Sequence, residues 1–209
     1  MQEQNPVSGS GTLGFTRLIN FTDAVTAIAI TLLILPLVDE ASSIGNLGPG
    51  AFLAENVYGL FAFGLSFVVI SRFWLGHHRM YEQVIGYTPG LIGANLLWLL
   101  CVVFLPFPTE LLNTADRGDP LTNGLYIGTL SVASGSSLVQ QLIISRTPAI
   151  RAPGTGPVPV LPLALLLALM LAALVVSILF PAIGLWALLL LFLQAPMHHL
   201  VLRTRKGHS

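Results

Sequence analysis

Charged and hydroxyl-bearing side chains interrupt an otherwise apolar stretch, RLINFTDAVTAIAITLLILPL, over residues 17–37. Arg17 opens the stretch, Asp23 follows six positions later, and hydroxyl groups occur at Thr26 and Thr31. In a helix with a rise of about 1.5 Å per residue, the acid lies about 9 Å beyond the arginine. An ionisable side chain inside a membrane costs free energy, so this carboxyl group is paired, functional or both.

A helical wheel divides this stretch into two faces. At about 100° per residue, one narrow stripe contains Arg17, Phe21, Ala24, Ile28, Thr31 and Leu35. Asp23, Thr26 and Ile30 fall on roughly the opposite side. We therefore expect one face to bury a carboxylate against partners, and the other face to present branched aliphatic side chains with one hydroxyl among them.

Hydrogen-bonding partners for the acid occur in the sequence SRFWLGHHRM, residues 71–80. Trp74 and His77 lie in this segment, and Asn95 lies about one turn inside the next apolar segment. All of them are predicted at the depth of Asp23, so we expect Asp23 to contact either His77 or Trp74. A buried polar network of this kind stabilises a protein only if every member is satisfied.

The composition predicts an all-α integral membrane protein. Of 209 residues, 54% are hydrophobic and only 9% are charged, against about 25% charged in a soluble domain. The mean hydropathy is +0.82. Spanning the hydrocarbon takes about 20 apolar residues. Six segments meet this requirement, at residues 18–38, 53–75, 91–112, 122–144, 159–180 and 182–202.

Basic residues predict the orientation of these six transmembrane helices. Of the nine Lys and Arg residues, only Arg117 falls on the opposite face from the others, so both termini are expected to be cytoplasmic. We expect a mobile cytoplasmic N-terminal tail over residues 1–16, a six-helix transmembrane domain over 17–203, and a basic cytoplasmic C-terminal tail over 204–209.

Several kinds of functional site have no counterpart in this sequence. A nucleotide-binding loop, HExxH and GxSxG are all absent, so we do not expect an enzyme. The segment GYTPG (86–90) is a turn and differs from the TVGYG loop of carbonyl selectivity filters, so no re-entrant filter is expected. His198 and His199 are adjacent and cannot share one helical face, and we expect no metal site, cofactor or nucleic-acid partner.

The segment RLINFTDAVTAIAITLLIL resembles the RxxxFSD motif that opens the first helix of the transmembrane protein 175 family, the lysosomal potassium channels and their prokaryotic homologues. Arg17, Phe21, Thr22 and Asp23 occupy the motif, with Thr22 in place of the usual serine. The segments FWLGHHRM and NLLWLLCVVFLPFPTELL are also similar to this family. The similarity covers most of the chain and is sharpest in the first three apolar segments.

This resemblance implies a potassium channel in the plasma (inner) membrane of a prokaryote, with modest selectivity for potassium over sodium. It implies a homotetramer in the lipid bilayer, with the first helix of each subunit lining a central pore. Ile28 would form the constriction, Thr31 would contact the permeant potassium ion, and Leu35 would form a second narrow layer. The structural polar network implied around the first helix comprises Arg17, Thr22, Asp23, Trp74, His77 and Asn95.

Two other functions remain open. A proton-coupled secondary transporter would use Asp23 and His77 as a relay and would show saturable flux coupled to a second solute. We expect no pair of interrupted helices of the kind typical of transporters, which weighs against this alternative. A non-transporting membrane scaffold would show no flux. In that case Asp23 would only hold the bundle together, and Ile28 would face lipid or the core.

Overall fold

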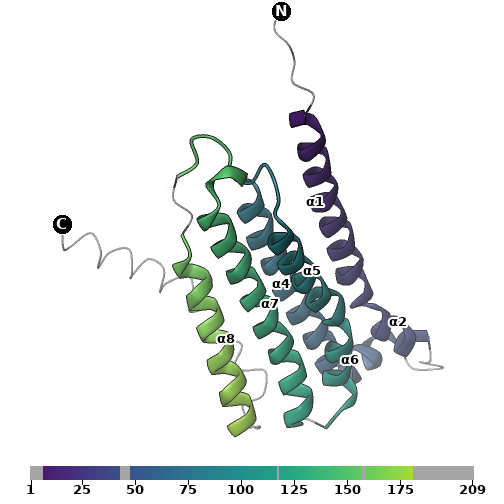
Figure 1. The fold of residues 1–209 in the computed structure, drawn as a ribbon. Helices are drawn as coiled ribbons and strands as arrows, with labels where there is room; N and C mark the ends of the chain where they lie inside the picture. Colours follow the sequence, from purple (N-terminus) through teal and green to yellow (C-terminus); the bar gives the residue numbers. More distant parts are fainter. Residues whose placement is uncertain (1–6, 43–47, 117, 157–158, 181–209) are drawn as a thin grey trace, which may run out of the picture.

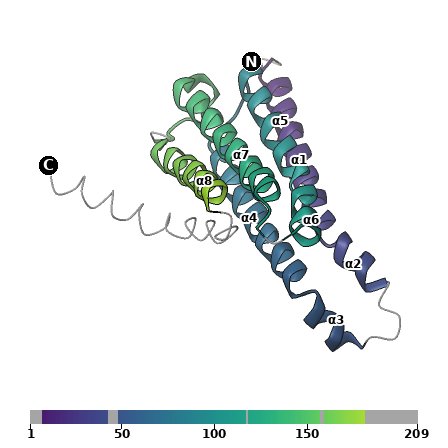
Figure 2. The ribbon, with the colours of Figure 1, turned by 90° about the horizontal axis from the view of Figure 1, so that it is seen from below.

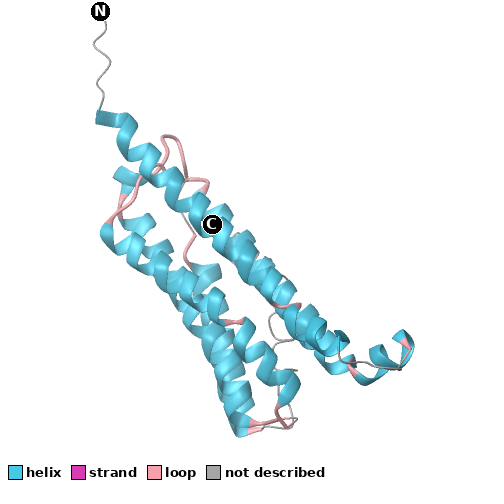
Figure 3. Cartoon of the chain, turned by 90° about the vertical axis from the view of Figure 1, so that its right-hand side faces the viewer, coloured by secondary structure: helices cyan, strands magenta, loops and turns pink. Residues whose placement is uncertain are grey.

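A computed structural model of the chain describes residues 7–42, 48–116, 118–156 and 159–180. Helices account for most of these residues (Figure 3). In chain order they are α1 (Val7–Leu32), α2 (Leu35–Ser42), α3 (Pro49–Glu55), α4 (Val57–Tyr81), α5 (Pro89–Phe104), α6 (Pro106–Thr114), α7 (Pro120–Arg146), the 3-10 helix η1 (Pro148–Ile150) and α8 (Leu161–Leu179). The all-α class predicted from composition therefore holds for the described part of the chain.

Five stretches of the described chain are long and apolar enough to cross a membrane. They are Leu13–Ser42, Val57–Tyr81, Pro89–Thr114, Pro120–Arg146 and Leu161–Leu179. These stretches correspond to the first five predicted segments and make the protein a multi-pass membrane protein. The segment predicted at 182–202, the histidine pair and the tail 204–209 lie outside the described residues. A sixth span and cytoplasmic termini therefore stay predictions.

Helix α1 begins ten residues before Arg17, which differs from the predicted mobile tail over residues 1–16. Packing at this end of the helix gives the physical reason. Phe15 is buried and its ring stacks on Tyr81 with centroids 6.0 Å apart. A Cβ atom added at Gly14 would lie only 2.9 Å from the hydroxyl of Tyr87. Such tertiary contacts override the low helix propensity of the Gly- and Ser-rich sequence.

The first predicted span is divided into two helices at Leu33 and Ile34, just before Pro36. Proline has no N–H group, so Pro36 cannot donate to the carbonyl of Leu32 as a continuous helix requires. The N–H groups of Leu33 and Ile34 instead donate to carbonyls three residues back, and both hydrogen bonds are 3.4 Å long. Helix α2 then leaves the axis of α1 (Figure 1). Leu35 therefore lies on a different helix from the rest of the predicted stripe.

Two further irregular segments occur in the described chain. Helix α5 ends at Phe104 and α6 begins at Pro106, so the third span is interrupted like the first, and the expectation that a pair of interrupted helices is absent was wrong. Among the described residues of the Pro- and Gly-rich segment 145–160, the short helix η1 is the one helix beyond the end of α7. The backbone of this segment pairs with the turn after α4 through an isolated antiparallel bridge between Val84 and Arg151.

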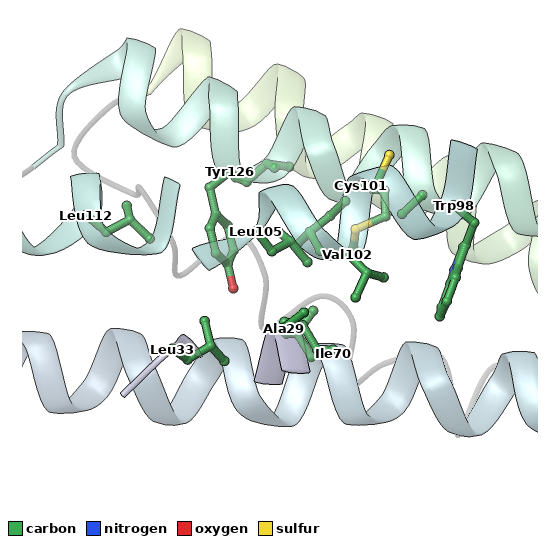
Figure 4. Close-up of a cluster of buried hydrophobic side chains, with 14 of the residues drawn as sticks. Ala29, Leu33, Ile70, Trp98, Cys101, Val102, Leu105, Leu112 and Tyr126 are labelled. Atoms are coloured by element: carbon green, nitrogen blue, oxygen red, sulfur yellow. The ribbon is translucent and has the colours of Figure 1, made fainter. Parts of the chain in front are cut away.

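The apolar core lies among α4, α5 and α7, and α1 packs on it from the edge of the bundle. Helix α7 packs most extensively against α8 and α5, whereas α1 mainly contacts α5 and α4 (Figures 1 and 2). Figure 4 shows how Ala29 of α1 and Leu33, just beyond its end, meet side chains such as Val102, Leu105 and Tyr126. Because only one side of α1 meets this core, its other side is left exposed within the described part of the chain.

Asp119 caps the N-terminus of α7. Its Oδ2 atom accepts hydrogen bonds from the hydroxyl of Thr122 at 2.6 Å and from the backbone N–H of Thr122 at 2.8 Å. Both bonds favour the ionised carboxyl group and lower the pKa of Asp119, the bond from the hydroxyl more than the bond from the backbone. The next residue, Pro120, occupies the first helical position, where a missing N–H costs nothing.

We expect the capping contribution of Asp119 to depend on pH. Because the pKa of Asp119 is lower in the folded state, the cap stabilises the protein above the ordinary carboxyl pKa of about 4 and loses this effect as the pH falls through the folded pKa. Asp119→Ala should therefore lower Tm at neutral pH, and the difference from wild type should shrink in acid. Thermal unfolding in detergent measures this difference, and one that did not change with pH would contradict the prediction.

Candidate functional site

One face of α1 is uncovered by the other residues that the structure describes. Ile28 is 57% exposed and Phe21 is 54% exposed, although both side chains are apolar. Leu35, at the start of α2, is 48% exposed. All members of the predicted stripe are exposed, namely Arg17, Phe21, Ala24, Ile28, Thr31 and Leu35. The two-faced helix predicted from the wheel is therefore present, even though the stripe runs across the break between α1 and α2.

The opposite face of α1 is buried and polar near its middle. Thr22 and Thr26 are fully buried, and Asp23 is half-buried. The hydroxyl of Thr26 donates to the carbonyl of Thr22 at 2.8 Å, and that of Thr22 donates to the carbonyl of Leu18 at 3.0 Å. Both hydroxyl protons are thus satisfied within the helix, which leaves their oxygens to accept bonds from neighbouring helices.

Asp23 is bound by the indole of Trp74. The Nε1 atom of Trp74 on α4 donates to Oδ1 of Asp23 at 2.9 Å. Of the two contacts predicted for Asp23, the one to Trp74 is confirmed, whereas His77 bonds elsewhere. A hydrogen bond to a carboxylate is shorter and stronger than a neutral one. This bond joins α1 directly to α4.

A second chain of hydrogen bonds joins α1 to α5 and α4. Nδ2 of Asn95 donates to the hydroxyl oxygen of Thr22 at 2.9 Å, and Oδ1 of Asn95 lies 2.7 Å from Nε2 of His77. Because the Thr22 hydroxyl donates to Leu18, it must accept from the amide nitrogen of Asn95, and this assigns the orientation of that amide. The amide oxygen then accepts from His77, whose proton is therefore on Nε2.

Aromatic rings hold His77 in place. Its imidazole stacks on the rings of Tyr81 and Trp98, with both centroid separations 4.4 Å. His77, Asn95 and Trp98 are buried almost completely. The histidine is therefore a fixed member of the bundle core, and its orientation is set by neighbours on α4 and α5.

Arg17 does not join these hydrogen bonds. It is exposed and belongs to the uncovered stripe, and no ion pair or hydrogen bond among the described residues joins it to Asp23. Six residues at about 100° each turn the helix by about 240° between the two positions, which keeps the guanidinium away from the carboxylate. The structure therefore brings together five members of the predicted network: Thr22, Asp23, Trp74, His77 and Asn95.

We expect Asn95→Leu to lower the free energy of unfolding by about 1 kcal/mol, because it leaves His77 Nε2 without an acceptor and Thr22 without a donor. Denaturant or thermal unfolding in detergent measures the loss. The double variant His77→Phe/Asn95→Leu removes the orphaned nitrogen and should be more stable than Asn95→Leu alone. A double variant that is less stable than both single variants would show that the His77–Asn95 bond does not account for the effect.

Thr31 provides the one hydroxyl on the uncovered stripe. Its Oγ1 donates to the carbonyl of Ile28 at 2.7 Å, and the side chain is exposed. The lone pairs of this oxygen are thus available beyond the surface of the chain, where they can contact a cation. The stripe combines an apolar layer at Ile28 with an oxygen layer at Thr31, about one turn apart.

Two polar contacts were not predicted in full from the sequence. Gln140 on α7 bonds to another helix, since the hydroxyl of Tyr81 on α4 donates to Oε1 of Gln140 at 2.8 Å. A hydroxyl cluster was missed, in which Ser66 lies 2.9 Å from the hydroxyl of Thr109 and 3.0 Å from that of Tyr126. Isolated polar residues in apolar segments indicate burial, but their spacing does not identify the partner.

These features define a multi-pass helical membrane protein with one helix face left uncovered. The model of the family described as endosomal/lysosomal potassium channel TMEM175 matches residues 17–106. Residues 17–106 are therefore similar to this family, in agreement with the resemblance noted for the motif in the first helix. The matched region contains the uncovered stripe and all five residues of the network.

Bacterial relatives extend this similarity. Potassium channel B446_29190 of Streptomyces collinus is 38% identical over 104 residues, which are 49% of this chain and 50% of the relative. Potassium channel Cha6605_3372 of Chamaesiphon minutus is 37% identical over 97 residues, 46% of this chain and 48% of the relative. The matched part of the chain thus spans about half the length of these curated relatives.

Structural similarity reaches further along the chain. The crystal structure of a lysosomal potassium-selective channel TMEM175 homolog from Chamaesiphon minutus superposes with a TM-score of 0.72. The match covers 88% of this chain and 97% of that chain, at 24% sequence identity. The fold of this protein is therefore that of the TMEM175 homolog.

Proposed function

We propose that this protein is a potassium-conducting channel in which α1 lines the pore. The uncovered stripe of α1 is the observation that carries the proposal. It presents Ile28 and the Thr31 hydroxyl on the surface of a helix whose other face is anchored inside the bundle. The similarity of residues 17–106 to the TMEM175 family supports it, as do the two bacterial relatives that are named potassium channels.

Assembly follows from the position of α1. A single helix at the edge of a bundle cannot enclose a pore, so copies of α1 from several subunits must surround one axis. We infer a homotetramer, as the resemblance to the family implies. The bilayer surrounds this assembly, and bacterial relatives favour the plasma membrane of a prokaryote.

The chemistry of the stripe suggests how potassium would pass. A ring of Ile28 side chains would exclude water when the helices are close together and admit ions when they spread, which is gating by dewetting. The Thr31 hydroxyls would replace part of the hydration shell of the ion. Because potassium loses its hydration water more easily than sodium, such a pore would prefer potassium modestly. Leu35 would form a second apolar layer.

The contacts of Asp23 argue against the transporter alternative. A relay between Asp23 and His77 needs groups that both accept and release protons, but Asp23 bonds to the indole of Trp74. An indole N–H only donates and cannot pass a proton on. His77 bonds to Asn95 instead. A 26% identical human relative is named endosomal/lysosomal proton channel TMEM175, so proton flux belongs in the test as a second permeant ion.

Ion flux through purified protein in liposomes tests the proposal. Separate gradients of potassium, sodium and protons would be applied to vesicles that contain folded, tetrameric protein. We expect passive flux that prefers potassium and does not saturate at low concentration. Saturable flux that is coupled to a second solute would favour the transporter, and absence of flux would favour the scaffold.

A further inference from the structure

Helix α2, which follows α1 after the break before Pro36, has its own hydrogen bond to the rest of the bundle. Helix α2 carries Glu40, whose Oε1 accepts a hydrogen bond from Nδ2 of Asn113 on α6 at 2.8 Å. The Asn113 amide lies directly against Gly59 of α4, because a Cβ atom at that glycine would come within 2.6 Å of Asn113 Oδ1. Helix α2 is therefore joined to α6 by this hydrogen bond, and Gly59, which has no side chain, leaves room for the Asn113 amide.

This hydrogen bond, the outer anchor, is separate from the network around Asp23. The inner anchor joins α1 to Trp74 on α4 and to Asn95 on α5. The outer anchor joins α2 to Asn113 on α6. Each anchor holds a helix whose exposed side carries one aliphatic residue of the stripe. The inner anchor holds α1, which carries Ile28, and the outer anchor holds α2, which carries Leu35. The two aliphatic layers are thus fixed to different parts of the bundle.

The backbone between the layers does not couple them as one rigid helix. Pro36 removes a helical hydrogen bond, and the two bonds that bridge the break from Leu33 and Ile34 are 3.4 Å long. A recess lies behind the break, with Leu33, Pro36 and Leu37 on one side and residues of α4 and α6 on the other. The recess is small, with a cavity volume of about 10 Å³.

We propose that the Glu40–Asn113 contact positions the Leu35 layer independently of the Ile28 layer, so that the pore has two separately held constrictions. The inference rests on the proposed function and adds a second point of control to it. Glu40 and Asn113 are positioning residues in this scheme, because they act on the permeant ion only through Leu35.

The test compares one substitution in different backgrounds. Asn113→Leu removes the donor and is introduced into three parent proteins: wild type, Leu35→Ala and Ile28→Ala. For each parent, the potassium flux in liposomes with the substitution is divided by the flux without it. We expect a change of about threefold in wild type and in Ile28→Ala, and a ratio of about one in Leu35→Ala, since no large side chain is then left to position. Glu40→Gln keeps the acceptor oxygen and should leave the flux near that of wild type.

The outcomes are distinct. A ratio of about one in all three backgrounds would overturn the positioning role. A ratio of about one in both alanine backgrounds would show that the two layers move as a single unit. A ratio that stayed at its wild-type value in both alanine backgrounds would show that the effect of Asn113 does not act through Leu35. Each of these results would overturn the proposal. Absence of potassium flux from folded parent proteins would instead overturn the proposed function. Should Asn113→Leu fail to fold, Gly59→Ala displaces the same amide and serves in its place.

Discussion

Replacing Ile28 by asparagine is expected to raise potassium flux about tenfold, which corresponds to lowering the barrier by about 1.4 kcal/mol. The amide would hydrate the narrow apolar layer and remove the dewetting barrier. The preference for potassium over sodium should weaken, because a hydrated constriction no longer requires the ion to lose water. Since Ile28 is 57% exposed within the chain, the substitution removes little core packing. Liposome flux with potassium and sodium gradients measures both effects.

A matched control separates pore effects from the general effect of adding an amide. Ile178 on α8 is 51% exposed, and α8 lies on the opposite side of the bundle from α1 (Figure 1). Ile178→Asn should leave flux and selectivity near those of wild type. If Ile28→Asn channels that are intact tetramers conducted like wild type, Ile28 would not be the constriction.

The second large effect is expected at Asp23. We predict that Asp23→Ala lowers the free energy of unfolding by about 2 kcal/mol, because the Trp74 Nε1 group loses a charged acceptor. Loss of this bond also weakens the attachment of α1 to α4, so we expect a smaller fraction of the proposed tetramer and a reduced ability of the proposed channel to gate. Unfolding in detergent, size-exclusion chromatography and liposome flux measure the three consequences.

A double-mutant cycle tests whether the bond to Trp74 is responsible. Trp74→Phe removes the donor and keeps an aromatic ring, so Asp23→Ala should cost much less in that background than in wild type. Asp23→Asn retains an acceptor oxygen and should fall between wild type and the alanine variant. Asp23→Ala protein that assembled and gated normally would show that Asp23 does not anchor the pore helix.

The wheel prediction succeeded because the periodicity of a helix is a local property. Residues at about 100° intervals share a face wherever the helix packs, so the stripe containing Ile28 and Thr31 follows from the sequence order alone. The same periodicity explains the position of Arg17, because the helical wheel already places Arg17 and Asp23 on different faces. Its inclusion in the network came from the family motif, and the structure does not place it there.

Partner choice was less predictable. Trp74 and His77 lie one turn apart on α4, so both were candidates for Asp23, and only the packing of α4 against α1 separates them. The Glu40–Asn113 contact had no counterpart in the sequence analysis at all. Its two members are 73 residues apart, and neither residue type nor spacing indicates that α2 meets α6.

The sequence by itself determined the membrane class, the first five apolar spans and the two faces of α1. Hydropathy and helical periodicity act within one segment, so they can be read without knowing its neighbours. Only the tertiary structure decided that Trp74 holds Asp23, that Asn95 links Thr22 to His77, and that α2 has its own anchor. These contacts depend on how separate helices rotate and pack against one another, and no single segment carries that information.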